Sequence, residues 1–260
     1  MHQLDLSEYP DLERAIGITP GTVIELHHLK RGLATAWVSG DSSNPRAVVI
    51  QLHDLLEEPF AFGTDAGAIW AILRSIEGWT CVNVDQDNAR DLRPIMKWYY
   101  PVVRPVEDIY YVLRGVPLAA FASAPPDIET RLLTPSDWAL IERSAQPLQG
   151  RGFGSPVAML REGIVAGSIV DDGDGGHLVA IAHTSAFAGQ YADVAAYTDE
   201  GYRRHGLSSY AAALVMRELA GRGLSAVWST SEGNRAARRV ADKLGLREVS
   251  RRVYLIPSTG

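Results

Sequence analysis

The chain has 260 residues, of which 46% are hydrophobic and 22% are charged, and its net charge is −6; this composition is typical of a globular protein with one large or two modest domains and argues against general nucleic-acid binding. Its single cysteine, Cys81, excludes an internal disulfide and a cysteine-rich metal site, and favours a reducing compartment. No apolar run reaches the ~18 residues of a membrane span, and the first residues do not resemble a signal peptide, so we expect a cytoplasmic protein without a membrane partner.

The first half of the chain is predicted to alternate strands with helices. Short runs of apolar residues predict strands, and longer alanine-rich or amphipathic stretches between turn residues predict helices. The helix predicted over residues 88–99 begins at Asn88 and is expected to break near Pro94. In chain order, the predicted strands cover residues 34–40, 46–52, 59–63, 80–84 and 108–115, and the predicted helices cover residues 65–76 and 88–99.

A polar stretch with prolines at 125, 126 and 135 separates the two halves. Such punctuation is typical of a domain boundary, which we place at residues 124–129, giving an N-terminal domain over residues 1–125 and a C-terminal domain over 130–260. The C-terminal half begins with a predicted helix over residues 135–144, for which Ser136 is a plausible N-cap. Residues 156–170 are predicted to form two strands joined by a turn at 161–163.

The rest of the C-terminal half repeats the alternation. Predicted strands cover residues 177–184, 191–198, 225–230 and 251–256, and predicted helices cover 207–219 and 234–244. Asn234 suits the N-cap of the last helix and Gly245 its end. Because Asn88 and Asn234 hold similar places in a strand–helix–strand–helix–strand order, the halves are predicted to be two copies of one α/β topology.

The sequence RRHGLSS, residues 203–209, lies where a strand is predicted to give way to a helix. The region from Asp193 to Arg252 contains ten Arg and one Lys against seven Asp and Glu, although the whole chain is acidic. A helix N-terminus exposes N–H groups and a positive dipole end, and Gly206 leaves room for a ligand beside the backbone. The alternative is an ordinary turn with solvated arginines.

Two motifs in this region resemble the GNAT acetyltransferase superfamily. Arg203, Gly206 and Ser208 resemble the family's acyl-CoA motif, although serine replaces the usual final Gly or Ala. WSTSEGNRAARRVADKLGL, with Asn234 and its KLG ending, resembles the family's fifth strand and following helix. The variant is most similar to a two-domain branch that includes zwittermicin-resistance and glycine N-acyltransferase-like proteins. The resemblance covers residues 130–256 and implies a GNAT fold, an α/β fold with a mixed sheet, in the C-terminal half, preceded by an α/β domain that resembles a degenerate copy.

The resemblance implies a binding site for acetyl-CoA. Ala196, Tyr197 and Thr198 would contact the pantetheine arm, and the loop that follows would bind the pyrophosphate. Asn234 would contact the cofactor, although an N-cap role alone also accounts for it. The implied cofactor-binding residues are Ala196, Tyr197, Thr198, Arg203, Arg204, His205, Gly206, Leu207, Ser208, Ser209, Asn234 and Arg238.

Transfer of an acetyl group to an amine requires a base and a proton for the leaving thiolate. Asp193 is the first candidate for the base, because strand alternation puts it on one face with Ala195 and Tyr197; a solvent-facing strand residue is the alternative. His183 is the second candidate. Many family members carry a tyrosine acid seven residues after the helix-opening Asn, but Ala241 stands there. Tyr197 is therefore a candidate acid, with Tyr202 and Tyr254 as further hydroxyls.

The expected function is an N-acetyltransferase that moves an acetyl group directly from acetyl-CoA to an amine of a small molecule. The alternatives are a CoA-binding module without catalysis and an acyltransferase that uses a longer acyl-CoA. No metal is expected, because the sequence DDGDGGH has Ala182 where a calcium-binding EF-hand loop needs Glu. No nucleic-acid partner is expected, and a homodimer is one option implied by the resemblance.

Overall fold

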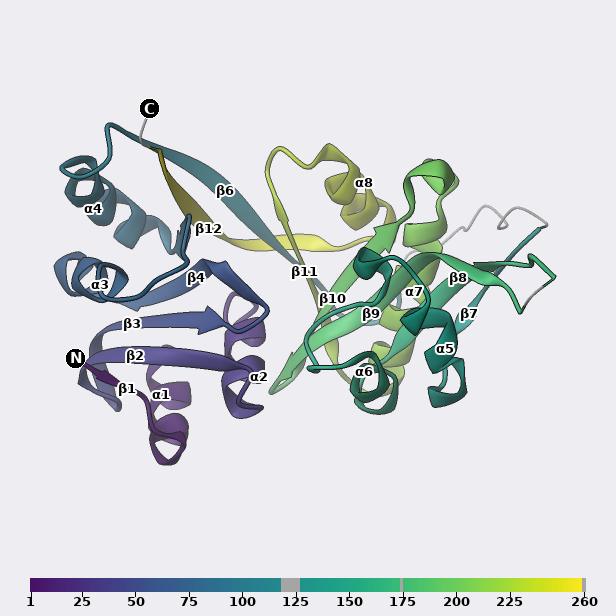
Figure 1. Cartoon of the computed structure of the whole chain (residues 1–260), viewed down its shortest axis with the longest axis horizontal. Coiled ribbons are helices and arrows are strands. Elements are labelled where there is room, and N and C mark those ends of the chain that lie inside the picture. Colours follow the sequence, from purple (N-terminus) through teal and green to yellow (C-terminus); the bar gives the residue numbers. More distant parts are fainter. Residues whose placement is uncertain (118–126, 174, 259–260) are drawn as a thin grey trace. The chain divides into compact units, whose positions relative to one another are not determined.

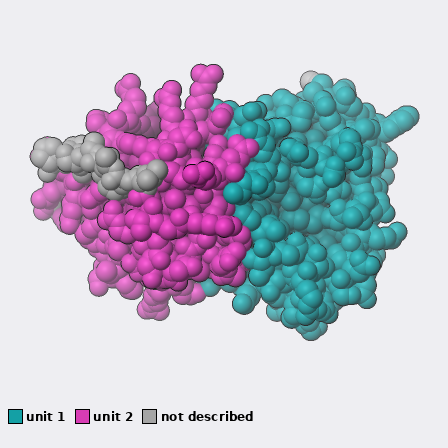
Figure 2. All heavy atoms as spheres, turned by 180° about the vertical axis from the view of Figure 1, so that it is seen from behind, with its two compact units in different colours: residues 1–110, 230–233, 249–260 teal, residues 111–229, 234–248 magenta. Residues whose placement is uncertain are grey.

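A computed structural model describes residues 1–117, 127–173 and 175–258 (Figure 1). The chain divides into two compact units (Figure 2): unit 1 comprises residues 1–110, 230–233 and 249–260, and unit 2 comprises residues 111–229 and 234–248. The boundary predicted at residues 124–129 lies partly outside the described residues. The division into domains 1–125 and 130–260 stays a prediction, since a compact unit need not follow the chain continuously.

The two halves of the chain contain the same order of strands and α-helices (Figure 1). Short 3₁₀ helices apart, each half runs strand, two helices, three strands, helix, strand, helix, strand, which agrees with the two-copy topology predicted from the sequence. The first half contains β1 (His2–Gln3), α1 (Tyr9–Ile16), α2 (Val23–Lys30), β2 (Ala34–Asp41), β3 (Asn44–Leu52), β4 (Leu55–Gly63), α3 (Ala66–Leu73), β5 (Val82–Val84), α4 (Gln86–Lys97) and β6 (Val102–Leu113). The second contains β7 (Ile128–Leu132), α5 (Trp138–Glu142), α6 (Pro156–Glu162), β8 (Val165–Val170), β9 (His177–Ala188), β10 (Tyr191–Thr198), α7 (Leu207–Gly221), β11 (Ser225–Ser231), α8 (Arg235–Leu244) and β12 (Arg247–Ser258).

The strands form a mixed sheet, as expected for the predicted fold class. In unit 1 the strand order is β1-β2-β3-β4-β5-β12-β6, and in unit 2 it is β11-β10-β9-β8-β7. The strand pairs β4–β5 and β10–β11 are parallel. The pairs β1–β2, β2–β3, β3–β4, β5–β12, β7–β8, β8–β9 and β9–β10 are antiparallel. A parallel pair requires a crossover, which α3 supplies in unit 1 and α7 in unit 2. Both crossover helices pack on their own sheet, α3 on β2–β4 and α7 on β7–β10.

Each unit has its own apolar core. In unit 1 the side chains of α3 and α4 pack on the central strands, with Ile69, Leu92 and Val82 all fully buried. In unit 2 the side chains of α5 and α6 pack on β8 and β9, with Ile141 and Met159 almost completely buried. Burial of such side chains stabilises a fold by roughly 1.5–3 kcal/mol each, so each core holds the strands of its own unit in place.

The prediction of two strands over residues 156–170 is wrong for its first part. Residues Pro156–Glu162 form α6, and only Val165–Val170 forms a strand, β8. Ser155 caps the helix by accepting a hydrogen bond from the N–H of Ala158 at 3.2 Å, and Pro156 suits the first helical position. The helix is too short for a periodicity distinguishable from strand alternation, and this explains the error.

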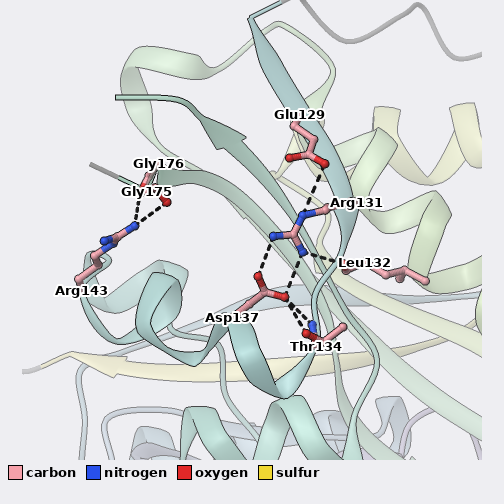
Figure 3. Close-up of polar contacts among 8 residues, drawn as sticks. All are labelled: Glu129, Arg131, Leu132, Thr134, Asp137, Arg143, Gly175 and Gly176. Carbon is pink, nitrogen blue, oxygen red and sulfur yellow. Dashed lines mark hydrogen bonds and ion pairs between the residues drawn. The ribbon is translucent and has the colours of Figure 1, made fainter. Parts of the chain in front are cut away.

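The N-cap predicted at Ser136 is also wrong, because Thr134 occupies that position. The carboxylate of Asp137 accepts hydrogen bonds from the N–H of Thr134 at 2.8 Å and from its hydroxyl at 3.0 Å (Figure 3). Arg131 donates to the same carboxylate at 2.7 Å, and this interaction is the main cause of the lowering of the Asp137 pKa to about 2. At the far end of α5, Arg143 donates to the carbonyl oxygens of Gly175 and Gly176 and so holds the β8–β9 turn (Figure 3).

Two further differences lie in the first half. The helices α1 and α2, residues 9–16 and 23–30, were not expected from the sequence. Helix α4 begins at Gln86, capped by Asp85, and continues past Pro94 to Lys97, so the predicted break is wrong. Leu92 and Met96, which flank the proline, are both fully buried, and their packing outweighs the lost hydrogen bond.

Unit 1 also contains a buried polar cluster of Asn83, Asp108 and Arg252. The guanidinium of Arg252 donates to the side-chain oxygen of Asn83 and, at 2.8 Å, to the carbonyl oxygen of Ala61. The amide of Asn83 donates to Asp108 at 3.4 Å. Burial disfavours the charged carboxylate and raises the pKa of Asp108 to about 6, despite the opposing effects of Tyr110 and Arg252.

The raised pKa of Asp108 predicts a specific loss of stability with pH. Because the native state holds the proton more tightly than the unfolded chain, this contribution is fully present below pH 3.8 and is lost as pH rises through about 6. The free energy of unfolding should therefore fall by roughly 2–3 kcal/mol across this range. Asp108→Asn should remove that step in urea unfolding curves recorded from pH 4 to 8; an unchanged step would assign it to another group.

Candidate functional site

A cavity of about 770 Å³ lies in unit 2 where strands β10 and β11 part. The two strands pair only from Tyr191–Ser225 to Asp193–Val227, and beyond this point they diverge. The first turn of α7 and the length of α8 as far as Lys243 also line the cavity. The cavity is lined by Ala196, Tyr197, Thr198, Tyr202, Arg203, Arg204, Gly206, Leu207, Ser208, Ser209, Trp228, Asn234, Ala236, Ala237, Arg239, Val240 and Lys243.

The turn that enters α7 has an unusual backbone. Arg204 has a φ of 72°, and it is the one non-glycine with positive φ among the described residues. Gly206, the N-cap of α7, has a φ of 79°, and a Cβ placed on it would meet no atom within 4 Å. The space beside the backbone is therefore open where the N–H groups and positive dipole end of a 15-residue helix begin. Such a helix start suits an anionic group.

The corresponding turn of the first half is built differently. A Cβ on Gly63 would lie 2.3 Å from the carbonyl oxygen of Arg46, so this glycine allows close packing on β3. Asp65 caps α3 by accepting a hydrogen bond from the N–H of Ala68 at 2.9 Å. A carboxylate already occupies the helix start and would repel a phosphate. The first half therefore lacks the open, cationic helix start that unit 2 has at Gly206.

Several cations line the cavity in unit 2. Arg204, Arg239 and Lys243 make no ion pair or side-chain hydrogen bond with any residue that the structure describes. Arg203 has a structural role, because its Nε donates to the carbonyl oxygen of Thr198 at 3.3 Å and its Nη1 lies 3.8 Å from Glu200. The cavity thus combines three cations without carboxylate partners with an open helix start, and this favours an anionic ligand.

Asn234 combines both of the roles considered for it. Its side-chain oxygen accepts a hydrogen bond from the N–H of Ala237 at 3.1 Å, which confirms the predicted N-cap of α8, and the residue also lines the cavity. On the opposite wall, the hydroxyls of Thr198 and Ser208 are hydrogen-bonded to each other. This bond ties the end of β10 to the first turn of α7.

Asp193 and His183, the candidate bases, lie outside the lining of the cavity. Asp193 is 5% exposed and accepts a hydrogen bond from the hydroxyl of Ser185. His183 is also buried; its Nδ1 lies 2.9 Å from the carbonyl oxygen of Thr184, and burial lowers its pKa. That contact assigns the proton to Nδ1 and leaves Nε2 as an acceptor.

The loop over residues 149–154 packs on His183 and on Ser185, the residue that donates a hydrogen bond to Asp193. A Cβ on Gly152 would lie 1.8 Å from the carbonyl oxygen of Ser185, and a Cβ on Gly150 would lie 3.2 Å from Nε2 of His183. Both glycines also have positive φ, 73° at Gly150 and 97° at Gly152. The two glycines therefore permit a close approach of the loop to β9 that a larger residue would prevent.

The structure gathers most of the predicted cofactor-binding residues around one cavity. Ten of the twelve line it, whereas His205 and Arg238 do not. Of the three predicted catalytic residues, only Tyr197 lines it. Sequence reasoning considered Tyr202 only as a hydroxyl, and it missed Trp228, Ala236, Ala237, Val240 and Lys243 as lining residues. Helical spacing could have grouped Ala236, Val240 and Lys243 on one face of α8, but it does not reveal that this face borders a cavity.

Two negative observations complete the description. Within residues 1–117, 127–173 and 175–258, no three His, Cys, Asp or Glu side chains come together as metal ligands would. None of the described helices combines the length and the apolar character needed to cross a membrane.

The region of the chain that contains the cavity is similar to a known family. Residues 151–253 match the sequence model of the family described as GNAT acetyltransferase. No curated protein matches the chain. Among solved structures, a GCN5-related N-acetyltransferase-like protein from Streptococcus suis is 17% identical with a TM-score of 0.68, over 96% of this chain and 98% of its own.

Two further solved structures are similar along nearly the whole chain. A GCN5-related N-acetyltransferase from Sphaerobacter thermophilus is 16% identical with a TM-score of 0.58, over 98% of this chain and 93% of its own. A tandem GNAT protein from the clavulanic acid biosynthesis pathway is 15% identical with a TM-score of 0.57, over 98% of this chain and 95% of its own. At these identities the likeness establishes the fold alone. The chain therefore has the fold of these proteins throughout, and its residues 151–253 match the model of the GNAT acetyltransferase family.

Proposed function

We propose that this protein is an N-acetyltransferase that uses acetyl-CoA as donor and a small-molecule amine as acceptor. The observation that carries the proposal is the cavity of about 770 Å³ with the open Gly206 turn at one end. The match of residues 151–253 to the GNAT acetyltransferase family model supports acyl transfer in general. The donor, the acceptor, a cytoplasmic location and a homodimer are parts of the proposal.

The residues of the cavity fit acetyl-CoA. The backbone from Arg204 to Ser209 would hold the pyrophosphate, and Arg204, Arg239 and Lys243 would neutralise its phosphate charges. From Ala196 to Thr198, β10 is no longer paired with β11. Its edge on that side can therefore offer backbone groups to the amides of the pantetheine arm. The turn with its three cations suits the charged phosphates of the donor, and the neutral edge of β10 suits the uncharged pantetheine arm.

In direct transfer the amine nitrogen attacks the thioester carbonyl carbon, the carbon–sulfur bond breaks, and the sulfur leaves as a thiolate that takes up a proton. Asp193 is proposed as the group that receives the amine proton. Its bond with Ser185 fixes the carboxylate, and the loop over residues 149–154 must move, or a water must bridge, for it to reach the acceptor. Ala241 is fully buried and offers no acid, so the hydroxyl of Tyr197, which lines the cavity, is proposed for the thiolate proton.

A CoA-binding module without catalysis is the second candidate. It is favoured by the burial of Asp193 and His183 outside the lining of the cavity and by the absence of a hydroxyl at Ala241. The third candidate, an acyltransferase for a longer acyl-CoA, differs from the proposal only in the donor. All three share the same binding site, so a measurement of turnover with several donors is needed to separate them.

The proposed activity predicts release of free CoA thiol from acetyl-CoA when a panel of small amines is offered. The measurement follows the thiol with a chromogenic disulfide reagent and identifies the acetylated amine by mass spectrometry. Acetyl-CoA affinity without turnover on any amine would favour the binding module. Faster release from butyryl-CoA or octanoyl-CoA than from acetyl-CoA would instead identify the longer-chain enzyme.

A further inference from the structure

A cluster of exposed apolar side chains follows helix α4 in unit 1. Trp98, the residue directly after the helix, is 88% exposed, while Tyr99 is 54% and Val102 is 52% exposed. The ring of Tyr99 is held in place, because it packs on Trp70 at 5.0 Å between centroids and the guanidinium of Arg74 lies 5.1 Å from its own centroid. Large apolar side chains that gather on a surface are typical of an interaction site, and Trp, Tyr and Arg most often carry binding energy there.

The surface around Trp98 is cationic. Residues 93–104 contain no Asp or Glu and three cations, those of Arg93, Lys97 and Arg104, although the whole chain is acidic. Lys97, Arg104 and the nearby Arg74 make no ion pair with any residue in the described part of the chain. A partner for this surface should therefore offer carboxylates beside an apolar recess that accepts the indole.

An apolar recess lies in unit 1 itself, between the N-terminal segment and strand β2. This N-terminal cavity has a volume of about 230 Å³, and most of its lining is apolar, including Leu4, Leu6, Leu29 and Ala36. Its volume is below the range of roughly 300–1,000 Å³ that is usual for small-molecule sites, and it suits one large side chain. Leu6 is 71% exposed, so the wall that it forms is accessible to a partner.

The segment that lines the N-terminal cavity is acidic. Residues 1–13 contain no Lys or Arg and four carboxylates, those of Asp5, Glu8, Asp11 and Glu13. Asp5 and Glu8 lie within the stretch 3–9, which supplies four of the residues that line the cavity. Neither carboxylate is paired with a Lys or Arg in the part of the chain that the structure describes. The cavity therefore complements the Trp98 surface in both polarity and charge.

Both surfaces belong to the same edge of the unit 1 sheet, the edge that β1 forms (Figure 1). The sulfur of Met1, directly before β1, lies 3.6 Å from the hydroxyl of Ser75, and Ser75 follows Arg74 at the border of the Trp98 surface. Gln3, the last residue of β1, lines the N-terminal cavity. Two copies related by a two-fold axis at this edge would make the same pair of contacts twice.

We propose that the protein forms a two-fold dimer in which Trp98 of each copy enters the N-terminal cavity of the other. The cations around Trp98 then face the carboxylates of Asp5 and Glu8 in the second copy. The inference rests on the proposed function only for the homodimer, whose surface it names, and it is independent of the donor, the acceptor and the reaction.

The proposal is tested by sedimentation velocity of the full chain over a wide range of concentrations. Trp98→Ala is expected to raise the dissociation constant of the dimer about 30-fold, the effect of losing one interface hot spot. Trp138→Ala is the matched control, because Trp138 is also an exposed indole, 45% accessible, but lies on α5 of unit 2. It should leave the dissociation constant unchanged. A dimer that Trp98→Ala leaves intact would overturn the proposal.

Mixing two variants tests the insertion itself. Leu6→Ser removes an apolar wall of the N-terminal cavity without a change in charge, so neither it nor Trp98→Ala forms a complete contact alone. A mixed dimer restores one contact, that of Trp98 in the Leu6→Ser chain with the intact cavity of the Trp98→Ala chain. The mixture should therefore associate more tightly than either variant.

No gain on mixing would overturn the reciprocal insertion of Trp98. A chain that stays monomeric at every concentration would overturn the interface together with the homodimer. The release of CoA thiol tests the proposed reaction separately, so the failure of one proposal can be distinguished from the failure of the other.

Discussion

Replacement of Gly206 by glutamate is expected to weaken acetyl-CoA binding more than ~100-fold, measured by isothermal titration calorimetry. The new carboxylate would stand at the positive end of α7, where the phosphates of the donor are proposed to bind. No protein atom lies within 4 Å of the added Cβ, so the side chain can enter the cavity without a steric clash, and the positive φ adds a backbone strain that the control below shares. Its charge would also pair with Arg204, Arg239 or Lys243 and remove cations from the ligand.

Gly223→Glu is the control for this variant. Gly223 follows the other end of α7, has a φ of +72° against +79° at Gly206, and likewise has no atom near an added Cβ. The two substitutions therefore share the backbone strain and the added charge, and they differ in their position relative to the cavity. Gly223→Glu should bind acetyl-CoA as the parent does. Equal affinities for all three proteins would show that the Gly206 turn does not hold the phosphates.

Asp193→Asn is expected to lower the turnover of the proposed reaction at least ~100-fold without a change in acetyl-CoA affinity, since a general base contributes roughly 10²- to 10⁴-fold. The amide keeps the shape of the carboxylate but cannot receive the amine proton. Because Asp193 lies outside the lining of the cavity, its replacement should not alter the binding of the donor. Initial rates of thiol release and calorimetric titration of the same preparation measure the two quantities.

Asp193 is also a buried hydrogen-bonded residue, so a loss of turnover could follow from a loss of structure. Ser185→Ala separates the two effects, since it removes the hydroxyl that donates to Asp193 and leaves the carboxylate in place. We expect Ser185→Ala to retain more activity than Asp193→Asn at equal thermal stability. Full turnover in Asp193→Asn would transfer the role of base to His183 or to a water.

The sequence predicted the elements whose local signals are strong. The Arg203–Ser209 turn, the alanine-rich helix α7 and the Asn234-capped helix α8 were all predicted, because capping residues and glycines act on neighbouring backbone groups. Helices α1, α2 and α6 have at most eight residues. In elements this short, tertiary packing outweighs propensity, and the sequence pattern is ambiguous.

The sequence also predicted the part of the candidate site that depends on local signals. Residues close in sequence to the Gly206 turn could be placed from the motif, and the structure brings them to one cavity. Trp228, Lys243 and the burial of Asp193 depend on the distance over which β10 and β11 stay paired. That distance is set by packing between elements far apart in the chain, and no local pattern encodes it.

The course of β12 has a consequence for the biosynthesis of the protein. In unit 1, Val253–Leu255 pairs with β5, and Arg252 donates to Asn83 across 169 positions of sequence. Closing so long a loop is slow, and the ribosome supplies residues 249–258 only after all of unit 2. The first half of the polypeptide must therefore wait, with the edge of β5 unpaired, until translation is almost complete. Chaperone protection during that interval would be needed most by the half that emerges first.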